Sequence, residues 1–565
     1  MTAVLQEARP TTESRVRLLR PVLTTLLVAG ALHVGWVLLL ANSGGDIAAQ
    51  DAWAEFARTH PGSAYNFSWY GGMHTASYSL VSPFVMAAIG VRTTMVLAGT
   101  LSAGLLSLLL VRTGAVSRPM VASLVGAVSL LGNAVSGRVT FGLGLAFGLG
   151  ALAVVFAWPD RLRAAEPRYR LPRGALAALL AALATASSPV AGLFLGIAAA
   201  GLWLGHRHSA AYALGLPPVA VVGLSTLAFP FSGHQPIHWN SVVLPVLLGV
   251  VVALTAPRAW RTVRLGAVVY AAGVVLTWLV PSPIGTNVGR LALIFGGVLL
   301  VAILTSGGRR RTRAVTLVLA LLTSGSWQVA TAARDVVTTA PDAAWSADLG
   351  ALVRQLRQRD AGQGRVEVVP PKSHRDAAAL APYFNLARGW NRQTDAERNP
   401  LFYDSDVPLT ADSYRTWLDR WAVHYVVLSP GRPDDAAVEE AALVSGGLPY
   451  LTPVWSNASW QLYEVTDPTP IVAPPARVLT LGDDEVTLEI PSAGSVLVRI
   501  PASPWLTLVD AAGDPLPIER GCLSVRADPG PPEDDWVVVV APSAGVYRIT
   551  APYSLRRGTP CPDDG

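Results

Sequence analysis

Residues 44–83 read GGDIAAQDAWAEFARTHPGSAYNFSWYGGMHTASYSLVSP and directly follow the first long apolar run of the chain. This stretch carries several acids, a histidine and a cluster of aromatic side chains. A purely structural membrane protein needs only a short turn at such a place. We therefore interpret residues 44–83 as the active-site loop of a membrane enzyme.

The composition around this loop is that of a membrane protein. Apolar residues make up 51% of the chain, charged residues only 14%, and the mean hydropathy is +0.41, values that soluble domains of this length rarely reach. The apolar runs extend from about residue 20 to about residue 332, and soluble patterns follow. The predicted fold class is a polytopic α-helical membrane protein with about eleven transmembrane helices, an extracytoplasmic α/β domain and a C-terminal β-sandwich.

The distribution of arginines predicts the orientation. Four arginines precede the first span at 21–40, which we take as a retained signal-anchor, and this places the N-terminus in the cytoplasm. The other predicted spans are 93–111, 119–134, 138–158, 174–187, 189–204, 209–229, 241–256, 263–280, 288–305 and 313–331. An odd number of spans puts the loop at 43–92 and everything after about residue 334 outside. Since the chain has a single lysine, Lys372, its bias towards arginine fits a GC-rich bacterial genome, so we expect a multi-pass protein of the bacterial plasma membrane.

One apolar segment, 79–90, does not fit this count. It is too short to cross a hydrocarbon core about 30 Å thick, and counting it as a span would reverse every later loop. We expect a half-embedded or interfacial helix there.

The domain boundaries follow the change of pattern. Residues 1–335 form the predicted membrane domain, 340–466 an α/β domain and 474–556 the β-sandwich. In the α/β domain we expect helices at 343–359, 373–389, 414–419 and 434–445, strands at 364–371 and 424–430, and an edge strand at 459–465. The two cysteines, Cys522 and Cys561, favour a disulfide over free thiols if this end lies outside the cytoplasm, and their spacing suits no metal site.

Two acids of the loop are candidate catalytic bases. Asp46 lies at the outer end of the first span and Asp51 five residues later. An acid just outside the bilayer can deprotonate an acceptor hydroxyl if a donor with a good leaving group lies beside it. On a helix from about residue 47, we expect Trp53 and Phe56 to rest on the membrane surface. The alternative is that both acids are solvated side chains at a helix end.

Other polar and aromatic side chains are candidate substrate contacts. Trp69 and Tyr70 can stack on a sugar or belong to the interfacial aromatic belt, and His74 can act on the substrate or be a structural histidine. Arg138 and Arg290 lie at outer mouths of spans, where each can hold a lipid phosphate or extend to the headgroups.

Two outer histidines complete the candidates. His234 and His238 are placed to line the same outer cavity, but Pro236 between them breaks the helix that a metal pair would need. We therefore predict neither a metal site nor a cofactor, while a divalent metal is left open.

In plan, the chain resembles the GT-C superfamily of polytopic glycosyltransferases that use polyprenyl-phosphate-linked donors. The likeness lies in the long first outer loop with an acid just past the first span, the short helix after it, the number of spans and the outer soluble region. The resemblance implies that Asp46 in GGD is the catalytic acid. Many members have an adjacent acidic pair, whereas Ile47 follows Asp46 here, so the base assignment stays open between Asp46 and Asp51.

The outer α/β region also resembles uncharacterised bacterial membrane proteins. The motifs are NLARGWNRQTD (385–395), YRTWLDRWAVHYVVLSP (414–430) and SWQLYEV (459–465). Some of those proteins carry the label "pyruvoyl-tetrahydropterin synthase-related", but no zinc-binding histidine cluster stands in this sequence. Within the region, Arg388, Trp390 and Arg392 are candidate sugar or phosphate contacts, with a structural Trp and surface arginines as the alternative.

These observations support one function over two others. The first is an inverting membrane glycosyltransferase that takes a sugar from a polyprenyl-phosphate donor to an extracytoplasmic glycan or glycolipid, with membrane lipid but no nucleic acid as a partner. The second is a non-catalytic envelope scaffold that binds polysaccharide. The third is a transporter or flippase, which would show polar midplane residues and internal repeats.

Overall fold

The computed structural model describes residues 12–41, 44–158, 166–230, 233–235, 237–306, 311–339, 343–528 and 535–562. The chain divides into two compact units. Unit 1 comprises residues 1–41, 89–224 and 236–336, and unit 2 comprises residues 42–88, 225–235 and 337–565.

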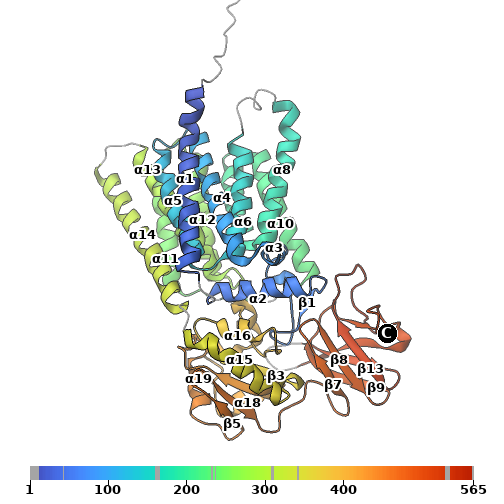
Figure 1. Cartoon of the computed structure of the whole chain (residues 1–565). Coiled ribbons are helices and arrows are strands. Elements are labelled where there is room, and N and C mark those ends of the chain that lie inside the picture. The colour runs from blue at the N-terminus through green and yellow to red at the C-terminus, as the bar shows by residue number, and fades with distance from the viewer. Residues whose placement is uncertain are drawn as a thin grey trace, which may run out of the picture. The chain divides into compact units, whose positions relative to one another are not determined.

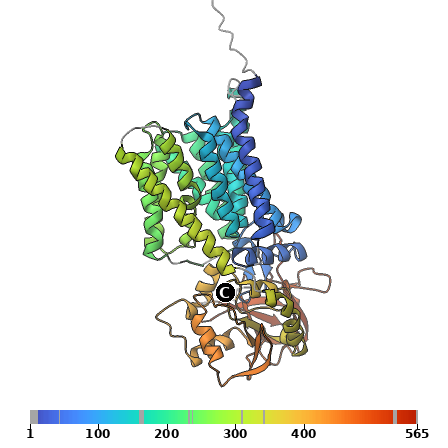
Figure 2. The same ribbon diagram turned by 60° about the vertical axis from the view of Figure 1, so that its left-hand side comes forward.

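Unit 1 is a bundle of long apolar helices (Figures 1 and 2). Each predicted span overlaps one of these helices. They are α1 (Thr12–Leu39), α4 (Val91–Arg112), α5 (Pro119–Val135), α6 (Val139–Phe156), α8 (Glu166–Ser187), α9 (Pro189–Leu204), α10 (His208–Ala228), α11 (Trp239–Thr255), α12 (Arg261–Leu279), α13 (Arg290–Thr305) and α14 (Arg311–Thr339).

Among the described residues, seven helices are long and apolar enough to cross a membrane. They are α1, α4, α6, α10, α12, α14 and the helical stretch Gly285–Thr305 that contains α13. Shorter apolar helices are α5, α9 and α11. The chain is thus a membrane protein with a helical N-terminal part, and the count of about eleven spans stays a prediction.

Small residues allow the helices of unit 1 to pack closely. A Cβ atom on Gly99 of α4 would lie 2.1 Å from Nε2 of His33 on α1, and one on Gly104 would lie 2.5 Å from a methyl of Leu26. Close approach of this kind is how helices associate in lipid, where the hydrophobic effect supplies no attraction between them. His33 is therefore a packing residue of the α1–α4 contact.

The short apolar segment forms α3 (Ser82–Ile89), a helix of eight residues. Among the described helices, α3 is not one of those long enough to span a membrane. This agrees with the short helix that the sequence predicts there.

The first part of unit 2 is a mixed sheet of order β3-β4-β6-β5 with helices packed on it (Figure 1). Its strands are β3 (Arg365–Val368), β4 (Val423–Leu428), β5 (Leu451–Ser456) and β6 (Gln461–Val465), of which β3 and β4 pair in parallel. Its helices are α15 (Ala343–Gln358), α16 (Arg375–Leu380), α17 (Arg392–Arg398), α18 (Ala411–Arg420) and α19 (Val438–Ser445).

Two predictions for this sheet were wrong. The helix expected at 373–389 is only α16, since Pro382 and Gly389 follow it and disfavour its continuation. The strand expected at the edge, β6, lies between β4 and β5. One of the two edge strands is β5, which the sequence did not predict because Pro453 interrupts its pattern. An edge is where a strand tolerates proline.

The second part of unit 2 has two antiparallel sheets that share one apolar core. Their orders are β10-β13-β8-β7 and β11-β12-β9. The strands are β7 (Arg477–Leu481), β8 (Glu485–Ile490), β9 (Gly494–Pro501), β10 (Thr507–Val509), β11 (Cys522–Ala527), β12 (Asp535–Ala541) and β13 (Gly545–Thr550). Cys522 and Cys561 form a disulfide, which ties the last described residues to β11.

Candidate active site

The loop that organises the sequence belongs to unit 2. It begins with α2 (Asp46–Thr59), so Asp46 is the first helical residue. The preceding glycines fit a tight turn, because Gly45 has a φ of +64° and a Cβ on it would lie 2.7 Å from Cγ2 of Thr339. A Cβ on Gly44 would lie 2.9 Å from the carbonyl oxygen of Thr339. The GGD sequence is thus required by the turn that presents Asp46.

Two hydrogen bonds hold this turn from the α/β part of unit 2. The amide of Gly45 donates to the carbonyl of Ser373 at 2.7 Å. The indole Nε1 of Trp390 donates to the carbonyl of Gly45 at 2.9 Å. The backbone just before Asp46 is therefore held in place by residues more than three hundred positions later in the sequence. The spacing of residues in the sequence does not reveal such a contact.

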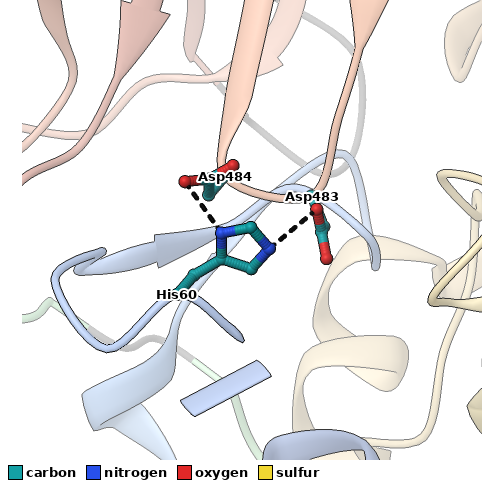
Figure 3. Close-up of side chains that lie close together, drawn as sticks. All are labelled: His60, Asp483 and Asp484. Atoms are coloured by element: carbon teal, nitrogen blue, oxygen red, sulfur yellow. Dashed lines mark ion pairs between the residues drawn. The ribbon is translucent and has the colours of Figure 1, made fainter. Parts of the chain in front are cut away.

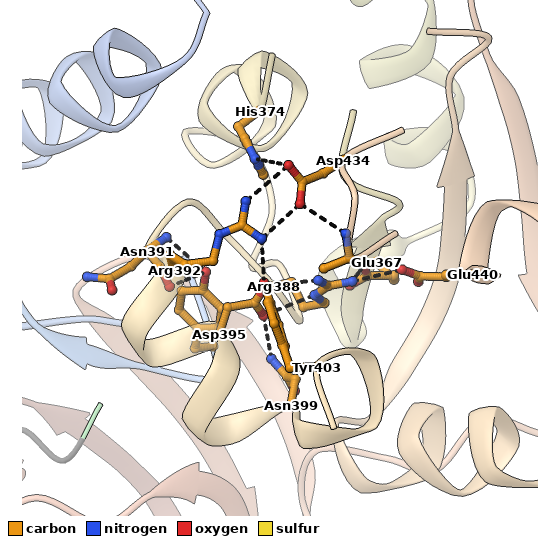
Figure 4. A network of polar contacts seen from close by, with 12 residues as sticks. Glu367, His374, Arg388, Asn391, Arg392, Asp395, Asn399, Tyr403, Asp434 and Glu440 are labelled. Atoms are coloured by element: carbon orange, nitrogen blue, oxygen red, sulfur yellow. Dashed lines mark hydrogen bonds and ion pairs between the residues drawn. The ribbon is translucent and has the colours of Figure 1, made fainter. Parts of the chain in front are cut away.

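Trp390 lies against His374 and Arg392, two members of a polar network (Figure 4). Its ring stacks on His374 with 3.5 Å between the centroids and 7° between the planes. His374 Nε2 lies 3.3 Å from Oδ2 of Asp434, and Asp434 accepts two hydrogen bonds from Arg392 at 2.8 and 3.0 Å. Burial raises the pKa of Asp434, but its hydrogen bonds to His374 and Arg392 outweigh burial and hold that pKa well below the usual range.

Arg388 occupies the centre of the same network. Its guanidinium forms a two-pronged pair with Asp395 at 3.0 and 2.8 Å and donates to Glu440 at 2.8 Å, and its side chain is only 2% exposed. Its donors in this conformation therefore serve carboxylates of the protein, not a sugar or a phosphate. Burial and the neighbouring Glu440 raise the pKa of Glu367, 3.8 Å from Arg388, well above its usual value.

Asp51 lies on a different side of α2 from Asp46. Five residues at about 100° each separate the two side chains by about 140° around the helix axis. Glu55, one turn after Asp51, pairs with Arg58 at 2.5 Å on an exposed face. Asp46 and Asp51 are thus not arranged as a pair that acts on one atom.

The expectation that Trp53 and Phe56 rest on the membrane surface was wrong. They are 1% and 5% exposed, and Trp53 packs edge-on against Trp69 with 5.5 Å between the ring centroids. The apolar side of α2 packs on the core of unit 2, and Trp53 is part of that core. An amphipathic helix has the same sequence pattern whether it covers a membrane or a protein core.

Trp69 and Tyr70 are also buried in unit 2. Trp69 is 1% exposed and packs so closely on Gly389 that a Cβ atom there would clash with its ring. The hydroxyl of Tyr70 accepts a hydrogen bond from the amide of Asn391 at 3.0 Å. Both side chains join the loop to the α/β part of the unit. In this conformation, neither offers a surface on which a sugar can stack.

His74 is a buried, neutral histidine. Its ring lies edge-on to Tyr65 and Phe229, and its Nε2 is 3.4 Å from Oγ of Ser503. Burial, with a smaller contribution from the charge of Arg398, lowers the pKa of His74 to about 4. The side chain therefore carries no charge at neutral pH.

This pKa predicts a pH dependence of stability. Because the pKa of His74 is about 4 when folded and about 6.5 when unfolded, the unfolded chain binds the proton more tightly. The stability that neutral His74 contributes is complete above pH 6.5 and is lost as the pH falls towards 4, by about 2 kcal/mol at pH 5. Urea unfolding of the full chain between pH 7.5 and 5 should show a smaller loss for His74→Gln than for the unsubstituted protein, by about this amount. The other buried histidines titrate alike in both proteins and cancel, so equal losses would contradict the assignment.

The two candidate arginines lie close together in unit 1. Arg138 directly precedes α6, and Arg290 begins α13 with its guanidinium 5.4 Å from the ring centroid of Phe141 on α6. Arg138 also lines a small polar hollow that includes Leu293 and Ile294, one turn after Arg290. Nη2 of Arg138 lies 3.8 Å from Oδ2 of Asp335, so the two side chains form an ion pair. The sequence analysis did not single out Asp335, although it follows Arg334 just after the last predicted span.

The two candidate histidines do not form a pair. His234 belongs to unit 2, where its Nδ1 lies 2.8 Å from Oε2 of Glu397. His238 belongs to unit 1 and directly precedes α11.

Another group of metal-ligand type is His60 with Asp483 and Asp484 (Figure 3). Nε2 of His60 lies 3.2 Å from Asp483 and Nδ1 lies 2.9 Å from Asp484. The two ring nitrogens thus face different carboxylates, so the imidazole bridges the two acids and does not direct one donor towards a shared centre. We assign no metal to it.

Comparisons with known proteins add the following. Residues 473–565 match the model of a domain of unknown function (DUF8823). No curated protein matches the chain. Similar solved structures include two cryo-EM structures of the arabinofuranosyltransferase AftD from Mycobacteria and the crystal structure of ArnT from Cupriavidus metallidurans bound to undecaprenyl phosphate.

The likeness to these structures is distant. The two AftD structures have 13% and 16% sequence identity over 94% and 84% of this chain, with TM-scores of 0.44 and 0.45, and ArnT has 13% over 80% with a TM-score of 0.39. The chain spans 61% and 41% of the AftD chains and 98% of the ArnT chain. Both proteins are GT-C glycosyltransferases, the class that the sequence resembles. Likeness at this level defines neither the activity nor the site residues of this chain.

Proposed function

We propose that the chain is an inverting glycosyltransferase of the GT-C type. It transfers a sugar from a polyprenyl-phosphate donor to the hydroxyl of an extracytoplasmic glycan or glycolipid. The observation that carries this proposal is Asp46, a carboxylate at the first residue of α2, directly after the first membrane helix and on a turn held by two long-range hydrogen bonds. Enzymes that position a base for proton transfer need this kind of fixed geometry.

In the proposed reaction, Asp46 accepts the proton of the acceptor hydroxyl. The hydroxyl oxygen forms a bond to the anomeric carbon, the bond from that carbon to the phosphate oxygen breaks, and the polyprenyl phosphate leaves with the electron pair. Attack from the face opposite the phosphate inverts the anomeric centre. Asp51 lies about 140° around α2 from Asp46, so the two acids are alternative bases and not a pair.

Arg138 and Arg290 are the proposed phosphate-binding residues. They are neighbours at the starts of α6 and α13, and arginines hold phosphate oxygens in a two-pronged geometry and stabilise the charge on a leaving phosphate. Arg138 would exchange its 3.8 Å contact with Asp335 for the phosphate. We place the protein in a bacterial plasma membrane with its N-terminus in the cytoplasm and unit 2 outside.

The test is a turnover assay with the purified full chain in lipid nanodiscs. The donors are undecaprenyl-phosphate-linked arabinofuranose, mannose and glucose, each with an oligosaccharide acceptor, and the readout is release of undecaprenyl phosphate by mass spectrometry. We expect one donor to be consumed with inversion at the anomeric carbon. Binding of oligosaccharide without any release would instead support the envelope scaffold.

A further inference from the structure

The carbonyl of the peptide bond between Gly45 and Asp46 accepts two hydrogen bonds, one from the backbone amide of Ala48 at 3.0 Å and one from a side chain. Trp390 donates its indole N–H to the carbonyl oxygen of that peptide bond at 2.9 Å. Because a peptide unit is planar, fixing its carbonyl also fixes the direction in which the chain enters the next residue. The indole therefore acts on the backbone that carries Asp46.

The indole is in turn held rigidly. It stacks at 3.5 Å on His374, which is bonded to Asp434, and the guanidinium carbon of Arg392 lies 5.3 Å from the indole centroid. The residue before His374 contributes the second anchor, since the carbonyl of Ser373 accepts the amide hydrogen of Gly45 at 2.7 Å. One short segment of the α/β part thus supports both sides of the same turn.

We infer that Trp390, supported by His374, is a positioning residue for Asp46. The inference rests on the proposed function, because it concerns the residue to which that function assigns the base. Trp390 does not contact substrate in this role. It fixes where the carboxylate stands, so its loss lowers turnover and leaves donor affinity unchanged.

The test compares two substitutions that each remove one indole hydrogen bond. Trp390→Phe keeps an aromatic ring and loses the bond to Gly45, whereas Trp417→Phe loses a bond of the same length, 2.9 Å, to Oδ1 of Asn399 within the same part of unit 2. Trp390→Phe should lower kcat by about 10- to 100-fold with little change in KM, and it should speed hydrogen–deuterium exchange of the amides of residues 45–48. Trp417→Phe should change neither quantity.

A second pair of variants reaches the same turn without touching Trp390. Gly45 has a positive φ, and the Cβ added by Gly45→Ala would also clash with Thr339. The Cβ added by Gly62→Ala would have no atom within 4 Å. Gly45→Ala should reproduce the faster exchange and the lower kcat, and Gly62→Ala should not.

The outcomes separate the two proposals. Exchange at residues 45–48 that is the same in Trp390→Phe and Trp417→Phe overturns the positioning role, whatever the turnover. Full turnover in Asp46→Asn overturns the proposed function instead, while the exchange experiment still decides whether Trp390 fixes the turn.

Discussion

Asp46→Asn should lower kcat by a factor of about 10² to 10⁴. Asparagine has nearly the same shape as aspartate and fits the same first turn of α2, but its amide oxygen cannot take the proton of an acceptor hydroxyl. Since the proposed phosphate-binding arginines are unchanged, KM for the donor should stay within about threefold of its original value. The measurement is steady-state release of undecaprenyl phosphate by the nanodisc-embedded full chain.

Two further α2 variants make this result specific. Glu55→Gln also removes one carboxylate from the helix, in an exposed pair with Arg58, and should keep full turnover. Asp51→Asn decides between the two candidate bases: if it abolished turnover while Asp46→Asn remained active, the base would be Asp51. An unchanged melting temperature in all three variants would exclude loss of folded protein as the cause.

The parts of the fold that the sequence predicts are those governed by local patterns. Long apolar runs mark the membrane helices because each must bury its length in lipid on its own. The place of Asp46 after the first span and the short helix before residue 90 follow from the same reading. These features depend on neighbours along the chain, which the sequence displays directly.

The surroundings of the candidate site were not predictable in this way. The apolar face of α2 has the sequence pattern of an interfacial helix, yet Trp53 packs into the core of unit 2 and Phe56 is buried. The support of the Gly45 turn comes from Trp390 and Ser373, and such long-range contacts leave no periodic signal in one sequence. Arg388 reads as a cation available to a ligand, whereas three-dimensional packing places it between Asp395 and Glu440.

The burial of this network has a consequence for how the turn is held. Arg388 and Asp395 lie in the segment that carries Trp390 and Arg392, and Asp434 is the acid that contacts both Arg392 and His374. Buried charges keep a single arrangement only while each has its partner. The geometry of the Gly45 turn therefore depends on ion pairs that do not touch it.

Asp395→Ala should destabilise unit 2 by about 3–5 kcal/mol. Burial raises the pKa of Asp395, but the charge and hydrogen bonds of Arg388 outweigh burial. The pKa of Asp395 therefore lies below its usual value, and the side chain is ionised. The carboxylate of Asp395 accepts hydrogen bonds from Arg388, Asn399 and Tyr403 at 2.8, 2.8 and 2.6 Å, and the substitution removes all three. It also leaves the guanidinium of Arg388, which is 2% exposed, with less counter-charge.

The matched control for this prediction is Asp435→Ala, which removes a carboxylate 2.7 Å from Lys372 that is 77% exposed and should cost less than about 1 kcal/mol. Urea unfolding of the full chain, followed by pulse proteolysis within unit 2, measures both. Equal midpoints for Asp395→Ala and Asp435→Ala would show that the buried pair adds no net stability, and the rigidity of the Gly45 turn would then need another source.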